Sequence, residues 1–170
     1  MPELPDILAY LHALRERIVG QPLLKIQVRS PFLLRTVQPD LMTLQGMVVR
    51  DLSRIGKRIV WHFDGELFLV FHLMIAGRFH LKKPGTLPKG KNDLAAFGFE
   101  DFTLMLTEAS QKKRASLHLL KGQAALAQQN RGGLEPLDAS LSVASTLRCL
   151  LCSRAWYSSQ RSSSIGESEM

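Results

Sequence analysis

The pattern of apolar and polar positions predicts one helix at the start of the chain. Between Pro5 and Val19, apolar residues recur at the spacing of a helical face, and Gly20 ends the pattern. Pro5 suits the first turn of a helix, and Asp6 interacts favourably with the positive end of the helix dipole. The sequence therefore predicts an N-terminal helix over residues 5–19.

Beyond this helix the period changes to that of β-strands. Apolar and polar residues alternate from Leu24 to Val28, which is typical of a half-buried strand. An Asp64-Gly65 turn of the hairpin type is expected between two later strands, and a short helical link at 39–44. The expected strands, about eight in all, cover residues 24–28, 47–52, 58–63, 66–73, 78–82, 94–99, 102–106 and 116–120.

Many short strands with close turns between them favour an antiparallel sandwich or barrel. We expect an α+β fold that is mostly β, namely an antiparallel β-sandwich of about eight strands with the N-terminal helix packed against it. The composition changes further on, because ten of residues 140–170 are serine against four of residues 1–139. We therefore predict a domain over residues 1–141 and a serine-rich, disordered tail over residues 142–170.

Charge narrows the choice of partner. The net charge of +7 and the isoelectric point near 9.8 favour an anionic partner, with nucleic acid the first candidate and an anionic membrane surface the second. The alternative is a charge that serves solubility alone. The sequence contains no apolar run of membrane-spanning length, and its opening lacks the features of a secretory signal. With two cysteines and no disulfide framework, these features predict a cytoplasmic protein.

The two cysteines, Cys149 and Cys152, have the spacing of half a zinc site. A tetrahedral site needs two more ligands, but the sequence has no second cysteine pair and no histidine after Cys152. We interpret the pair as two incidental thiols and expect this chain to hold no metal and no other cofactor.

Pro2 is the first candidate for chemistry. Methionine is normally removed ahead of a small second residue, which would leave Pro2 with a secondary amine. An α-amino group titrates near about pH 8, so a useful fraction of it is neutral and nucleophilic. Such an amine can attack C1′ of a sugar and form an iminium intermediate, while the neighbouring Glu3 carboxylate moves protons. The alternative is that these residues only start a helix.

Four segments of the chain, in the same order, resemble the formamidopyrimidine-DNA glycosylase and endonuclease VIII family. The opening is the most specific, because the proline of this family must be the second encoded residue. The segments are Pro2-Glu3-Leu4-Pro5-Asp6-Ile7, Ile55-Gly56-Lys57-Arg58, Phe71-His72-Leu73-Met74-Ile75-Ala76-Gly77-Arg78-Phe79, and Leu106-Thr107-Glu108 leading into Lys112-Lys113-Arg114. The resemblance extends from Pro2 to Leu141. It implies a β-sandwich flanked by helices, in agreement with the fold predicted from periodicity.

The resemblance implies catalytic roles for three residues. Pro2 is expected to be the nucleophile, with Glu3 as its acid and base partner. Lys57 is expected to lie near the phosphates of the lesion and to assist catalysis. Without the flanking match, Lys57 is better interpreted as a solvated lysine at the end of a strand.

The resemblance also implies residues that contact DNA. His72 is expected to contact a backbone phosphate, and Ile75 to fill the gap that an extruded base leaves, because flipping loses stacking worth about a few kcal/mol. The alternative for both is packing in the core, and the alternative for the basic loop is a solvated tip. The predicted DNA-binding residues are His72, Ile75, Arg78, Lys112, Lys113 and Arg114.

The sequence departs from the family pattern in three places. Asp6 stands where many relatives carry glutamate, and Arg114 lies near the place where some relatives present an aromatic wedge. Full-length relatives continue into a helix-two-turns-helix region and often a zinc finger. Residues 132–137 resemble the linker into that region, after which the likeness stops. We expect a C-terminally truncated chain, produced by a frameshift, a premature stop or a gene-model error.

The leading hypothesis from the sequence is a base-excision DNA glycosylase and AP lyase that is weak or inactive in this chain. Binding to DNA scales with the number of phosphates neutralised, so a missing C-terminal region is expected to weaken it. One alternative is a catalytically inactive module that binds damaged DNA, and another is a non-functional fragment. The expected partner is double-stranded DNA with damaged bases or abasic sites, with no membrane and no obligate protein partner.

Overall fold

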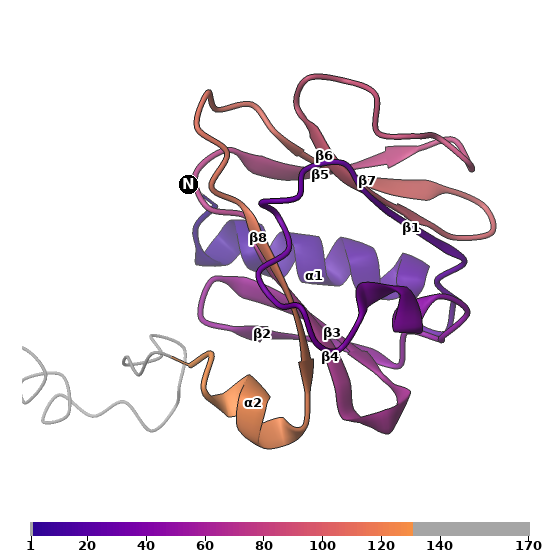
Figure 1. The fold of residues 1–170 in the computed structure, drawn as a ribbon, viewed down its shortest axis with the longest axis vertical. Helices are drawn as coiled ribbons and strands as arrows, with labels where there is room; N and C mark the ends of the chain where they lie inside the picture. Colours follow the sequence, from indigo (N-terminus) through magenta and orange to yellow (C-terminus); the bar gives the residue numbers. More distant parts are fainter. Residues whose placement is uncertain (1, 131–170) are drawn as a thin grey trace, which may run out of the picture. The chain divides into compact units, whose positions relative to one another are not determined.

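The computed structural model describes residues 2–130. They form eight strands, two α-helices and two short 3-10 helices (Figure 1). In chain order these are α1 (Leu4–Ile18), β1 (Lys25–Val28), η1 (Leu41–Leu44), β2 (Asp51–Ile55), β3 (Arg58–Phe63), η2 (Asp64–Glu66), β4 (Leu67–His72), β5 (Gly77–Lys82), β6 (Asp93–Gly98), β7 (Thr103–Glu108), β8 (Ser116–Lys121) and α2 (Gln123–Ala127).

The strands form two antiparallel sheets of four strands each. One sheet has the order β1-β6-β7-β5 and the other the order β2-β3-β4-β8. Apolar side chains on the facing sides of the two sheets form one core, and Trp61, Phe71 and Phe97 are fully buried in it. These three rings come from both sheets, with centroids 4.7 to 5.4 Å apart. The predicted β-sandwich is therefore confirmed.

Helix α1 packs against both sheets. Its buried residues Ile7, Leu14 and Ile18 recur at helical spacing and belong to the same core. Tyr10 meets Phe79 of β5 edge-to-face, with ring centroids 5.6 Å apart. At the other end of the helix, Arg15 bonds to Asp51 at 3.0 Å and to the backbone carbonyl of Leu52 at the start of β2. These contacts place the beginning of α1 beside β5.

The short helix α2 covers the outer side of the second sheet. Its Leu126 packs with Val60, Phe68 and Val70 in a small cluster that is separate from the main core. Because these outer positions of β3 and β4 are apolar, the sheet needs such a cover on the side away from the core. The sequence showed no helical period here, and α2 was not predicted.

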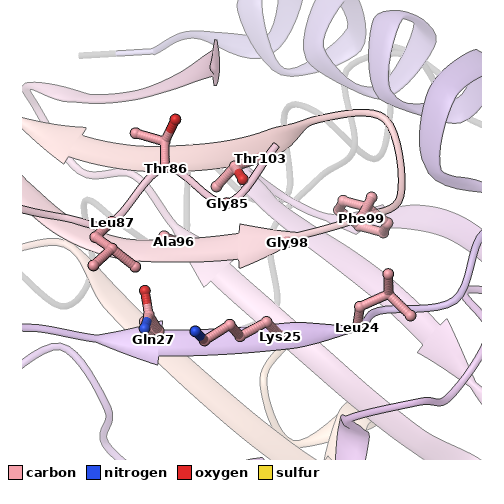
Figure 2. Close-up of a pocket in the computed structure, with 10 residues that line it drawn as sticks. All are labelled: Leu24, Lys25, Gln27, Gly85, Thr86, Leu87, Ala96, Gly98, Phe99 and Thr103. Carbon is pink, nitrogen blue, oxygen red and sulfur yellow. The ribbon is translucent and has the colours of Figure 1, made fainter. Parts of the chain in front are cut away.

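The long connection between β5 and β6 lies over the outer side of the first sheet. Beneath it, Ala96, Thr103 and Met105 are buried although they face away from the main core. A hollow of about 190 Å³ lies between this connection and β1. Figure 2 shows Lys25 and Gln27 of β1 on one side of it. The small residues Ala96 and Gly98 leave room for it, and the Thr103 hydroxyl there has no hydrogen-bond partner among the described residues.

Several boundaries differ from those expected. Strand β2 begins at Asp51, whereas residues 47–52 were expected, because the segment before it pairs with the residues after α1 instead. Val48 makes an isolated bridge to Pro22, and the Val49 N–H donates to the Gln21 carbonyl at 3.1 Å. The turn after β3 has three residues, Asp64–Glu66, rather than two. The predicted tail over residues 142–170 and the domain boundary at 141 lie outside the described residues. Within residues 2–130, no helix is long and apolar enough to cross a bilayer.

His118 makes the stability of this fold dependent on pH. Burial lowers the pKa of His118, and the charges of Arg58 and Arg35 lower it further. Below about pH 6.5 the unfolded chain therefore binds a proton that the folded chain does not, so stability is lost as the pH falls. We predict that the urea midpoint decreases between pH 8 and pH 5.5, and that the decrease is smaller in His118→Gln. Equal decreases in both proteins would contradict this assignment.

Candidate functional site

Two of the connections between the sheets bring several of the predicted site residues to one edge of the sandwich. Residues 73–76 lead from β4 to β5, and residues 109–115 lead from β7 back to β8. Because β4 pairs with β8 and β5 with β7, the connections run side by side. His72 is opposite Ser116 where they leave one sheet, and Gly77 is opposite Glu108 where they reach the other. Segments that are more than thirty residues apart in sequence thus meet at this edge.

The beginning of α1 places Pro2 at the same edge. Pro2 is buried and lines a pocket of about 310 Å³ together with Asp6, Tyr10 and the side chain of Arg78 at the start of β5. The Asp6 carboxylate accepts a hydrogen bond from the backbone N–H of Glu3 at 2.8 Å. This bond fixes the first turn of the helix and therefore the direction in which the chain enters the site.

Glu3 and Lys57 form an ion pair beside Pro2. The Lys57 ammonium donates to the Glu3 carboxylate over 2.5 Å, and both side chains are partly exposed. Lys57 lies in the Gly56-Lys57 turn between β2 and β3, where Gly56 has a φ of 56° that favours glycine. The structure thus brings Lys57 to Glu3, which lies 54 positions away in sequence and next to Pro2.

The turn that carries Ile75 is tight and exposed. Met74 has a φ of 53°, a conformation that costs a non-glycine residue about 1–2 kcal/mol. The Ile75 side chain is 52% exposed, so the alternative of core packing is wrong for this residue. The turn closes through a hydrogen bond from the backbone N–H of Gly77 to the Leu73 carbonyl at 2.9 Å. An apolar side chain is therefore held in solvent at the edge where Pro2 lies.

The basic residues of the second connection are arranged differently from one another. Lys112 and Arg114 are exposed, whereas Lys113 is half-buried and donates to Asn92 at 3.1 Å and to the backbone carbonyl of Glu108. His72 is half-buried at the end of β4, where it pairs with Ser116 in the sheet.

Glu108 is 1% exposed, and sequence analysis gave it no role of its own. Its signal in the sequence is a carboxylate at the end of a strand that has no other charged residue.

Within residues 2–130, no three histidine, cysteine, aspartate or glutamate side chains gather in a way that could hold a metal ion. Cys149 and Cys152 lie outside the described residues. The expectation that this chain holds no zinc therefore stays a prediction.

A family model describes most of this chain. Residues 1–119 match the model for the formamidopyrimidine-DNA glycosylase N-terminal domain. The chain belongs to the formamidopyrimidine-DNA glycosylase family. Members of this family with the same name include one from Heliobacterium modesticaldum, 33% identical over 148 residues, and one from Mycoplasma genitalium, 29% identical over 141 residues. These alignments cover 84% and 82% of the chain.

Solved structures of glycosylases bound to DNA have the same fold. A structure of MutM in complex with carbocyclic 8-oxo-G containing DNA superposes with a TM-score of 0.67 at 26% identity. It covers 75% of this chain, and this chain covers 47% of it. The Lactococcus lactis enzyme, non-covalently bound to DNA with an AP site, gives a TM-score of 0.67 at 26% identity, with coverages of 74% and 48%. The chain spans about half the length of the curated relatives it matches, 53% and 49% for the two above.

The turn around Ile75 requires glycine at position 77. A Cβ atom on Gly77 would lie 2.3 Å from the Leu73 carbonyl oxygen, so the backbone of the turn would have to move. We predict that Gly77→Ala lowers the free energy of unfolding by about 1–3 kcal/mol, measured by urea denaturation.

Gly90→Ala provides the matched control. A Cβ atom there would approach within 2.9 Å of only the side chain of Asp93, which can rotate away. A Gly77→Ala variant no less stable than Gly90→Ala would show that the turn is freely adjustable.

Proposed function

We propose that this chain acts on damaged DNA as a base-excision DNA glycosylase and AP lyase, with Pro2 as its nucleophile. The observation that supports this most directly is the ion pair of Glu3 and Lys57 next to Pro2, which lines a pocket with Asp6 and Arg78, in a member of this family. The proposed partner is double-stranded DNA that contains damaged bases or abasic sites. Its proposed place of action is the cytoplasm.

In the proposed reaction, removal of Met1 gives Pro2 a secondary amine. Its nitrogen attacks C1′ of the deoxyribose, the bond from C1′ to the base breaks, and the base leaves with a proton. Opening of the sugar ring then gives an iminium between Pro2 and C1′. Loss of a proton from C2′ and departure of the 3′ phosphate break the strand by elimination. Hydrolysis of the iminium returns the free amine.

Glu3 is proposed to move protons in these steps. Its carboxylate is next to Pro2 in the chain and is held by Lys57 over 2.5 Å. An ammonium at that distance fixes the position of the carboxylate through a charge-assisted hydrogen bond. Lys57 is only partly exposed and retains donors that can contact a phosphate of the lesion. The ion pair thus joins the proposed acid and base to the proposed phosphate contact.

Residues around the pocket are proposed to hold the DNA. Ile75 is an exposed apolar side chain on a tight turn, which suits insertion into the gap that a flipped base leaves. Arg78 lines the pocket of Pro2, and His72 lies at the end of β4 beside the Ile75 turn. Lys112, Lys113 and Arg114 were all predicted to contact the DNA. The exposed Lys112 and Arg114 are the better placed of the three to meet phosphates.

A second candidate is a module that binds damaged DNA without cutting it. The exposed Lys112 and Arg114 favour it, because binding to phosphates needs exposed cations and does not need the amine of Pro2. Such binding is expected to weaken steeply as the salt concentration rises.

Trapping with borohydride tests the role of Pro2. An iminium formed on an abasic-site duplex is reduced to a stable adduct, which we predict to map to the tryptic peptide of residues 2–15. We expect Pro2→Gly to decrease the yield by about tenfold or more, because it replaces the secondary amine. Mass spectrometry of the peptide gives the site of attachment.

Pro5→Gly provides the control, since it removes the other proline of the opening and leaves the amine intact. An adduct on Lys57, or one whose yield is the same in Pro2→Gly, would contradict the proposed nucleophile. Salt-sensitive binding to the duplex without any adduct would favour the module that only binds.

A further inference from the structure

Glu108 is a buried carboxylate at the base of the basic connection. Its side chain belongs to the last residue of β7 and is 1% exposed. A carboxylate removed from water to this degree costs free energy unless hydrogen bonds replace its hydration. The donors that replace it come from the connection that follows the strand, over residues 109–115.

Three backbone contacts tie this connection to the Glu108 carboxylate. The N–H of Arg114 lies 3.0 Å from Oε1 and 2.8 Å from Oε2, and the N–H of Ala115 donates to Oε2 at 3.1 Å. The hydroxyl of Ser110 lies within hydrogen-bonding distance of both the Glu108 carboxylate and the Lys112 carbonyl. One buried side chain thus holds both ends of the connection, and bonds to a charged acceptor are among the stronger ones in proteins.

Lys113 also holds the connection in place, through hydrogen bonds to the end of β7 and to the residue before β6. Its ammonium donates to the Asn92 side chain at 3.1 Å and to the backbone carbonyl of Glu108. The backbone carbonyl of Asn92 in turn accepts from the N–H of Glu108 at 2.8 Å. With Lys113 turned inward, the neighbouring Lys112 and Arg114 remain exposed on the connection.

We propose that Glu108 is a positioning residue that sets the basic connection for contact with DNA, with Lys113 as its tether. Lys112 and Arg114 are then the side chains that meet phosphates. The inference rests on the proposed function and deepens it. Glu108 contacts no DNA itself, and it acts by fixing the backbone from which Arg114 projects, beside the turn of Ile75.

The test measures binding of the full chain to a duplex with a tetrahydrofuran abasic analogue, which cannot be cut. Glu108→Gln keeps the size of the side chain but replaces one acceptor oxygen with a donor. We expect its Kd to rise by about tenfold at low salt. In a background of Lys112→Met and Arg114→Met, the same change has little further effect, because the two cations that Glu108 positions are gone.

The salt dependence of binding separates the tether from the contacts. The plot of log K against log salt has a negative slope, and each lost phosphate contact reduces the magnitude of that slope by about 0.9. Lys112→Met and Arg114→Met are expected to decrease the slope in this way. Lys113→Met should weaken binding with a smaller change in slope than either neighbour produces.

Thr103→Val is the matched control for a buried polar group on β7. Thr103 is 2% exposed and its hydroxyl has no partner among the described residues, so its loss should leave binding unchanged. Hydrogen exchange of the Arg114 and Ala115 amides adds a measurement without DNA, with protection expected in the wild type and lost in Glu108→Gln.

Unprotected amides in the wild type would overturn the inference. An unchanged Kd in Glu108→Gln would also overturn it, as would equal effects of that change in the wild type and in the Lys112 and Arg114 double variant. The proposed chemistry fails in a different way, namely when the wild-type chain binds the duplex but yields no adduct with borohydride.

Discussion

Strand pairing in two sheets at once is the constraint on which the site depends. The chain passes from β4 to β5 in one direction between the sheets and from β7 to β8 in the other. Since β4 pairs with β8 and β5 with β7, both passages must lie at the same edge of the sandwich. Any sequence that adopts this pairing brings its two connections together, whatever residues they contain. The chemistry at the edge is therefore decided by a few side chains on connections whose place the core has already fixed.

Two carboxylates near this edge lie in opposite environments. Glu3 is partly exposed and its charge is matched by Lys57, so it stays accessible beside Pro2. Glu108 is buried and its charge is matched by backbone N–H groups, so it stiffens the chain around it. A water-exposed ion pair is weak because solvent screens it, and it can exchange partners when a phosphate arrives. A buried carboxylate cannot exchange its partners in this way, so it suits a permanent anchor.

Periodicity in the sequence was sufficient to locate the strands but not to predict which strands pair in a sheet. The eight strands and α1 could be located from their apolar residues, because each has a side that faces a single apolar core. The start of β2 was misplaced, since the apolar residues Met47 to Val49 bond to residues 20–23 after α1 and not to β3. Helix α2 was missed because Leu126 is its one buried residue, too few to show a period. Which strands share a sheet depends on contacts that are distant in sequence.

The candidate site, like the fold, depends partly on neighbouring residues in the sequence and partly on contacts between distant segments. The resemblance located Pro2, Glu3 and Lys57 by their neighbours in sequence, and the fold brings the Lys57 ammonium to the Glu3 carboxylate, next to Pro2. It treated Lys112, Lys113 and Arg114 alike, because nothing in three consecutive basic residues says which one turns inward. That distinction comes from Asn92, which precedes β6 and reaches Lys113 only because β6 and β7 are paired. A local motif can thus name the residues of a connection, but which of them turns inward and which stay exposed depends on the sheet behind the connection.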